Sequence, residues 1–192
     1  MVSEDVTPPS AGALILPYQG KTPRIDPEAW LAPNATIIGE VTLERESSVY
    51  YGAVIRADMA EVRLGIGSNL QDNVVVHTDS GQPSLIGNGV SVGHLAVIHG
   101  CTIADNVLIG MGATVLNGAQ IGTGSLVAAG TVVLEGTVIP PRSLVAGVPG
   151  KVRRELSDAE VDKVISNAQH YLDLTISHRR LTAAAADRAL PR

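Results

Sequence analysis

The chain has 192 residues, enough for one domain of ordinary size, and a formal net charge of −5 at neutral pH. It contains no long basic run, so nucleic acid is not expected to be its main partner. A single cysteine excludes an intrachain disulfide framework and favours a reducing compartment, so we expect a cytoplasmic protein.

Residues 1–26 are predicted to form a leader with an extended piece over 13–18. Its start is polar and acidic and lacks the basic residues and apolar run of a signal peptide. Further on, the uncharged stretch 106–134 is long enough to suggest a membrane span. It contains six glycines and recurring polar residues, however, so we expect no contact with a membrane.

An all-β solenoid is predicted for residues 27–153, because an apolar residue recurs at a fixed spacing of six. A hexapeptide period is typical of a solenoid in which each unit forms one short strand and a turn. Three strands per coil give about 18 residues per turn and roughly seven turns. The absence of phenylalanine fits a narrow interior. The most regular positions are Ile103, Ile109, Val115, Ile121, Val127, Val133, Ile139 and Val145.

The first coils are less regular than the last ones. Residues 56–63 interrupt the six-residue register, and the pair Ile66-Gly67 restores it. A second interruption at 77–84 contains glycine and proline and is predicted to be a protruding loop. Because this loop has no fixed length in the repeat, the phase of His77 cannot be derived from the spacing.

A C-terminal α-helix is predicted within residues 154–192. Ser157 and Glu160 have the spacing of a capping box. The stripe that follows is apolar at helical spacing, so the helix is expected to pack along an outer face of the solenoid. Residues 181–192 either prolong this helix or fray from it. The stripe consists of Val161, Val164, Ile165, Ala168 and Leu172.

Three of the five histidines, His77, His94 and His99, lie within 23 residues. Neutral imidazole is the commonest nitrogen ligand of zinc, and three histidines with an open position form a catalytic arrangement. The alternative is that they are surface histidines on turns. His94 and His99 are five residues apart, about one face of the prism, and cannot easily converge inside one chain. The spacing therefore favours metal sites between subunits.

Two charged segments also require an explanation in such a plain scaffold. Arg56 and Asp58 lie in the register break, and Asp72 lies five residues before His77. Arginine is suited to a bidentate pair with a carboxylate. An ordinary salt bridge at a subunit interface explains these residues and is compatible with a catalytic role.

The chain resembles the γ-class carbonic anhydrase family over residues 24–155. The motifs that carry the resemblance, in the family's order and spacing, are Ile55-Arg-Ala-Asp58, Ile66-Gly-Ser-Asn-Leu-Gln-Asp72, His77, Val92-Gly-His94 and Ile98-His-Gly-Cys101. The resemblance implies a left-handed parallel β-helix, a homotrimer and metal sites between protomers. Zn²⁺ is the implied metal, and Fe²⁺ or Co²⁺ would accept the same ligands. The implied reaction interconverts CO2 and bicarbonate through a metal-bound hydroxide.

The resemblance also implies roles for individual residues. His77 and His99 would bind the metal from one protomer, and His94 from the next. The remaining site residues are Arg56, Asp58 and Asp72 in an interface ion-pair network, Gln71 as a hydrogen-bond partner of metal-bound water or substrate, and Tyr171 from the C-terminal helix near the metal. For Tyr171, simple packing is an alternative, because it lies at the edge of the apolar stripe.

The chain departs from the best-studied form of the family in its proton acceptors. Met59 stands where that form has a glutamate, and the short loop 78–84 contains Asp79 as its only acid. Two other functions remain open at this point. One is a hexapeptide-repeat acyltransferase that uses acetyl-CoA and a histidine base. The other is a metal-binding family member with little CO2 activity, either a thioesterase or a structural subunit.

Overall fold

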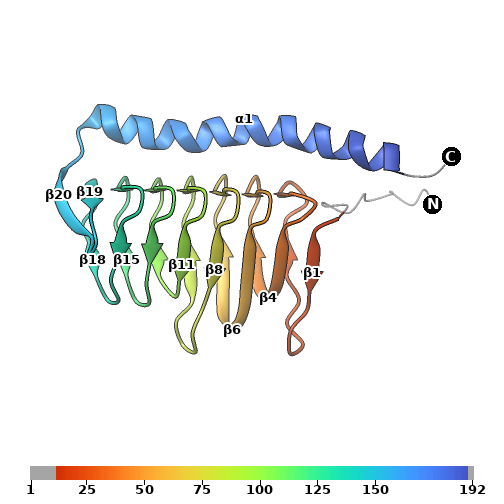
Figure 1. The fold of residues 1–192 in the computed structure, drawn as a ribbon, viewed down its shortest axis with the longest axis horizontal. Coiled ribbons are helices and arrows are strands. Elements are labelled where there is room, and N and C mark those ends of the chain that lie inside the picture. The colour runs from red at the N-terminus through yellow and green to blue at the C-terminus, as the bar shows by residue number, and fades with distance from the viewer. Residues whose placement is uncertain (1–11, 190–192) are drawn as a thin grey trace.

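The computed structural model describes the backbone of residues 12–189 and the side chains of residues 12–185. Short parallel strands stack into a prism, and one long helix follows the prism along its length (Figure 1). The expected left-handed parallel β-helix with a C-terminal helix is confirmed. Residues 1–11 of the predicted leader lie outside the described residues.

The strands form two sheets that make up the three faces of the prism. The larger sheet covers two faces and contains β1 (Leu14–Leu16), β2 (Arg24–Ile25), β4 (Thr36–Leu43), β6 (Val54–Leu64), β8 (Val75–His77), β9 (Ser84–Ile86), β11 (Val97–His99), β12 (Thr102–Ile103), β14 (Thr114–Val115), β15 (Gln120–Ile121), β17 (Val132–Val133) and β18 (Val138–Ile139). The smaller sheet covers the third face and contains β3 (Trp30–Leu31), β5 (Ser48–Val49), β7 (Asn69–Leu70), β10 (Ser91–Val92), β13 (Leu108–Ile109), β16 (Leu126–Val127), β19 (Ser143–Ala146) and β20 (Lys151–Glu155).

The number of coils agrees with the sequence period. The smaller sheet has eight strands, of which only β20 is antiparallel to its neighbour, so seven parallel strands correspond to seven coils. Strands β1 and β2 both pair in parallel with β4, so two strands lie on the first coil ahead of residue 27.

The register break at 56–63 is one continuous strand. Strand β6 pairs with β8 through its first residues and with β9 through its last ones, so it runs around a corner between two faces. The loop between β8 and β9 projects from the prism, as predicted (Figure 1). A backbone bridge between Asp79 and Gln82 closes this loop. Arg56 of β6 and His77 at the end of β8 are register partners where the strand leaves the first of these faces.

The core explains the Ile-Gly rhythm of the repeat. All eight of the regular anchor residues from position 103 to 145 are buried, each no more than 4% exposed. Each such burial stabilises the fold by about 1.5–3 kcal/mol. A Cβ on Gly110 would lie 2.5 Å from the backbone nitrogen of Ala129, and one on Gly122 would lie 2.4 Å from that of Pro141. Glycine follows the anchor where consecutive coils approach this closely.

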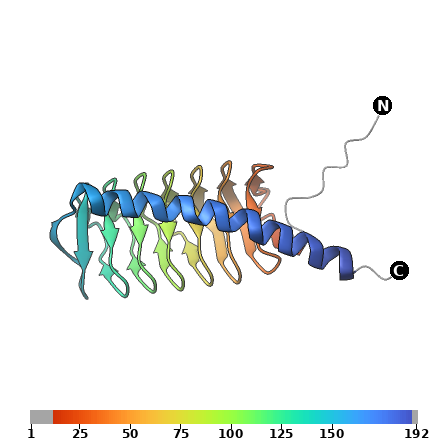
Figure 2. The same cartoon turned by 90° about the horizontal axis from the view of Figure 1, so that it is seen from above.

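Helix α1 (Asp158–Ala189) returns from the last coil to the first along one edge of the prism (Figures 1 and 2). A Cβ on Gly124 would contact Val161 at 3.4 Å, and one on Gly67 would contact Leu172 at 3.8 Å, so the stripe faces the turns. One helical turn rises 5.4 Å, and coils repeat every 4.7–4.9 Å, so each turn of α1 meets about one coil. Of the two alternatives for the C-terminal segment, the structure shows continuation, because residues 181–189 prolong the helix to Ala189.

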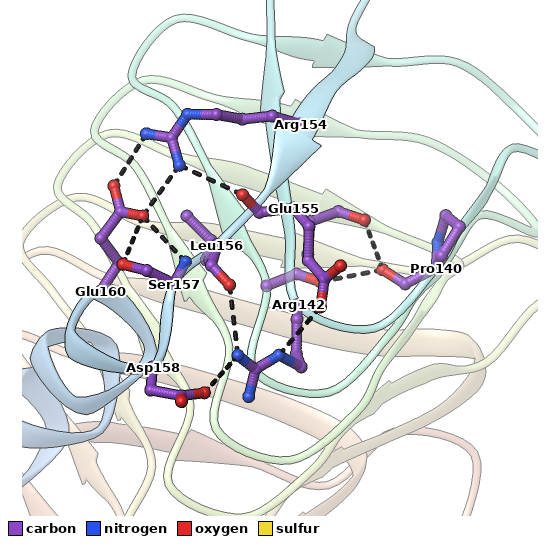
Figure 3. A network of polar contacts seen from close by, with 10 residues as sticks. Pro140, Arg142, Arg154, Glu155, Leu156, Ser157, Asp158 and Glu160 are labelled. Atoms are coloured by element: carbon purple, nitrogen blue, oxygen red, sulfur yellow. Dashed lines mark hydrogen bonds and ion pairs between the residues drawn. The ribbon is translucent and has the colours of Figure 1, made fainter.

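Polar contacts fasten α1 at both ends. At its start, Arg154 binds both carboxylate oxygens of Glu160, and Glu160 accepts hydrogen bonds from the backbone and hydroxyl of Ser157 (Figure 3). The same carboxylate pairing lowers the pKa of Glu160 to about 2. Near its end, Arg179 donates to the main-chain oxygens of Glu28 and Ala29, at 2.6 and 3.3 Å.

No helix among the described residues has the length and apolar character needed to cross a membrane.

Candidate metal centre

Two of the three candidate ligands lie side by side. His77 ends β8, His99 ends β11, and the two are direct register partners on neighbouring coils. Nδ1 of His77 lies 2.9 Å from Nε2 of His99. The strand pairing that stacks the coils therefore brings together two imidazoles that are 22 residues apart in the chain.

An ion pair lies on the coil before them. Nε2 of His77 lies 3.0 Å from Oδ1 of Asp58, and Arg56 pairs with the other oxygen of that carboxylate. Burial alone would raise the pKa of Asp58, but hydrogen bonds from Arg56 and His77 outweigh it and hold that pKa below its ordinary value. Asp58 is therefore a carboxylate that accepts from both neighbours.

An amide and a second acid lie on the other side of the pair. Oδ1 of Asn117 lies 2.8 Å from Nδ1 of His99, and Nδ2 of Asn117 donates to Asp79 at 2.7 Å. His77, Asp79 and His99 form a group whose potential ligand atoms lie within 4.8 Å of one another. The sequence reasoning missed Asn117. The coil period could have found it, because Asn117 follows His99 by 18 residues.

His94 lies apart from the other two histidines, in the turn after β10. Its Nδ1 lies 3.0 Å from Oδ2 of Asp72, and its side chain is 37% exposed. Asp72 also accepts a hydrogen bond from the backbone of Tyr51 at 3.2 Å. Within one chain Asp72 is thus bonded to His94 and not to Arg56, and the network proposed for Arg56, Asp58 and Asp72 would need two chains.

Gln71 is a buried amide that is hydrogen-bonded to the backbone of His94. It is 4% exposed, its Oε1 accepts from the backbone N–H of His94 at 3.2 Å, and its Nε2 donates to Asn69 at 3.3 Å. In this chain the amide therefore fixes the turn that carries His94.

Tyr171 reaches the same histidine from α1. Its hydroxyl lies 3.4 Å from Nε2 of His94, and its ring packs edge-on against Tyr50 with a centroid separation of 5.4 Å. Burial and, less strongly, the charge of Asp72 raise the pKa of Tyr171. Tyr171 therefore packs against Tyr50 and also contacts His94, and its role near the metal stays a prediction.

Hydrogen-bond directions test whether these residues fit a metal. A carboxylate can only accept, so Asp58 accepts the Nε2–H of His77. Nδ1 of His77 is therefore left with a lone pair. Asn117 turns its oxygen to His99, which leaves Nε2 of His99 with a lone pair. Two lone pairs that face each other at 2.9 Å repel unless a proton or a metal ion lies with them. The residues therefore fit a metal ion.

The comparisons with known proteins agree with this fold. A family model described as bacterial transferase hexapeptide (six repeats) matches residues 83–117 and 100–135. The solved structure of a Bacillus cereus protein with a provisional acetyltransferase name is 36% identical, covers 88% of this chain and 99% of its own, and has a TM-score of 0.87. The fold places this chain among the hexapeptide-repeat β-helix proteins.

Two relatives narrow the class further. A Methanocaldococcus jannaschii protein with a provisional carbonic anhydrase name is 58% identical over 145 residues, which are 76% of this chain and 91% of that protein. The Arabidopsis thaliana protein named gamma carbonic anhydrase 2, mitochondrial, is 42% identical over 164 residues, 82% of this chain and 59% of that protein. The chain belongs to the γ-class carbonic anhydrase family.

Proposed function

We propose that this protein is a metal-dependent carbonic anhydrase that interconverts CO2 and bicarbonate at sites between the protomers of a homotrimer. The observation that carries the proposal is the 2.9 Å contact between Nδ1 of His77 and Nε2 of His99, whose other ring nitrogens face acceptor oxygens of Asp58 and Asn117. Two relatives with carbonic anhydrase names support the choice of reaction. Zn²⁺ is the expected metal, and Fe²⁺ or Co²⁺ would accept the same nitrogen ligands.

The proposed homotrimer supplies the third ligand. A catalytic zinc site takes three protein ligands and keeps one position open. His94 has the same tautomer as His99, because Asp72 accepts from its Nδ1 and leaves a lone pair on Nε2. Within the single chain the hydroxyl of Tyr171 lies 3.4 Å from that nitrogen. Since its side chain is 37% exposed and lies away from His77 and His99, we infer that it serves the pair of a neighbouring protomer.

The bound metal would supply a nucleophile at neutral pH, because zinc lowers the pKa of a coordinated water toward about 7. The chain's own residues orient the ligands. Asp58 holds the tautomer of His77, Asp72 holds that of His94, and Arg56 keeps Asp58 ionised. Tyr171 covers Nε2 of His94 in the single chain.

Gln71 remains proposed as a hydrogen-bond partner of the substrate or of metal-bound water. In the chain its oxygen accepts from the backbone of His94 and one N–H of its Nε2 is donated to Asn69, so the second N–H of Nε2 is the group available for such a contact. We also propose a cytoplasmic location, because a chain with a single cysteine cannot form an intrachain disulfide and fits a reducing compartment.

The test is metal content together with CO2 hydration. Protein loaded with Zn²⁺ or Fe²⁺ is expected to retain about one ion per protomer and to hydrate CO2 in a stopped-flow assay. His99→Ala should abolish both, whereas His170→Ala, on an exposed position of α1, should change neither. Protein that binds no transition metal after loading would overturn the proposal.

An acyltransferase is the second candidate, favoured by the acetyltransferase name of the Bacillus cereus structure. It predicts acetyl-CoA binding that does not depend on metal, which calorimetry with metal-free protein measures. A thioesterase or structural subunit with little CO2 activity would instead bind metal and fail the hydration assay.

A further inference from the structure

We propose that Asp79 and Asn117 are positioning residues that set the tautomer of His99 and direct its Nε2 toward the metal. The inference rests on the metal site proposed above and extends it to the loop between β8 and β9. Asp79 belongs to that loop, and Asn117 lies one coil beyond His99.

The direction of every hydrogen bond in this chain of groups follows from the acid at its end. The carboxylate of Asp79 can only accept, so the neighbouring atom of Asn117 is the donor Nδ2, at 2.7 Å. The amide carbonyl is then turned to His99, where it can only accept, and Nδ1 of His99 carries the proton. Nε2 of His99 is left as the ligand nitrogen. One loop acid thus decides which nitrogen of a histidine two groups away can bind a metal.

The position of Asn117 is built into the coil. A Cβ on Gly100 would lie 2.1 Å from Oδ1 of Asn117, so the asparagine can cross this turn only because residue 100 is glycine. Asn73 and Asn106 also place their side chains against a glycine of the neighbouring coil. Their own φ values are +59° and +57°, so each of them supplies the positive φ of its turn. In the turn that contains Asn117, the residue with positive φ is the next one, Gly118, at +68°. The turn does not require Asn117, and its amide is bonded at both ends.

The loop that carries Asp79 is also tied to both histidine strands. The hydroxyl of Ser84 donates to the main-chain oxygen of His77 at 2.8 Å and accepts from the backbone of Gly100 at 2.9 Å. The Asp79–Gln82 bridge closes the loop tip. These contacts hold the carboxylate at a fixed place relative to His99. Outer partners of metal-binding histidines typically contribute 10–100-fold to metal affinity.

The experiment compares Asn117→Ala with the double exchange Asp79→Asn plus Asn117→Asp. The exchange keeps an acceptor beside His99 and a donor beside that acceptor, with the two side chains swapped. Gln120→Ala is the control, an exposed position three residues after Asn117, in β15. The first readout is the His99 tautomer in metal-free protein, by nitrogen-15 NMR of the imidazoles. The second is the zinc dissociation constant, by competition with a chelator.

The Nδ1–H tautomer is expected in the wild type, the control and the exchange variant, and a mixture of tautomers in Asn117→Ala. Zinc affinity should fall by about 10–100-fold in Asn117→Ala and recover in the exchange variant. An unchanged tautomer in Asn117→Ala would overturn the inference. So would an Asp79→Ala variant that loses metal as fully as His99→Ala while Asn117→Ala keeps it, because Asp79 would then be a ligand.

The two proposals fail separately. Wild-type protein that binds no metal would refute the metal site, and the tautomer in metal-free protein would still decide whether Asp79 and Asn117 position His99. If Asn117→Ala does not fold, the exchange variant decides alone: loss of the Nδ1–H tautomer in it would contradict the inference.

Discussion

Mixed trimers of two variants, each unable to bind metal alone, would show which protomer supplies His94. In a His77→Ala chain the pair with His99 is broken but His94 is intact, and in a His94→Ala chain the reverse holds. A complete site then needs a His94→Ala protomer next to a His77→Ala protomer in the correct order. In a random equal mixture each of these has a chance of one half, so about one quarter of the sites should be restored.

The assay is co-refolding of the two chains followed by metal analysis of the purified trimer. The matched control is a mixture of His77→Ala with His99→Ala. These residues lie 2.9 Å apart in one chain, so no mixture of the two variants can rebuild the pair. The control should recover no metal, whereas the first mixture should recover about a quarter of the wild-type content. Equal recovery in both mixtures, including none in either, would refute the arrangement between protomers.

Further predictions concern catalysis, assembly and stability. CO2 hydration should be limited by proton transfer and rise strongly with added imidazole buffer, because Met59 stands in place of a glutamate and Asp79, the acid of the short loop, is bonded to Asn117. A fast rate that ignores buffer concentration would contradict this. Arg56→Ala should raise the trimer dissociation constant far more than Arg180→Ala, since Asp58 and Asp72 would lose their cation at the proposed interface, and a carboxylate that assembly buries without a partner costs roughly 3–5 kcal/mol. Gly100→Ala should lower the melting temperature more than Gly81→Ala: both glycines have positive φ, worth about 1–2 kcal/mol, but only at Gly100 would the new methyl meet a side chain. The pKa of Glu160 is lowered to about 2, so its stabilising contribution is complete above the ordinary pKa of 4.5 and is lost as the pH falls toward 2. The stability of α1, followed by circular dichroism, should therefore fall between pH 4.5 and pH 2 in the wild type. The same fall should be smaller in a Glu160→Gln variant, which lacks this contribution at every pH.

The fold was predictable because a period of six leaves few solutions. One apolar residue per unit, small residues between, and glycine where coils approach together define a solenoid. The helix was predictable from its capping pair, Ser157 and Glu160, and from its stripe. Its length was not, because the alanine-rich tail has helical propensity but no sequence signal that distinguishes continuation from fraying.

The site was predictable only in part, for a reason of register. The two stacked histidines are 22 residues apart instead of 18, because the loop between β8 and β9 adds residues to one coil. Their pairing therefore could not be obtained from the period. Asn117 was accessible, since an exact coil separates it from His99. Asp79 was noticed only as a weak proton acceptor, because its contact with Asn117 depends on the path of an irregular loop.

Helix α1 changes how the prism should respond to unfolding. In a simple solenoid each coil interacts only with its neighbours, so the ends open first and independently. Here Arg142 of the last coil binds Asp158 at the start of the helix, and Arg179 near its end binds main-chain oxygens of the first coil. The two terminal coils are thus joined through a second route, the helix, which also contacts coils between them. Opening either end releases contacts at the other, so hydrogen exchange should report nearly equal protection for the first and last coils instead of two independently fraying ends.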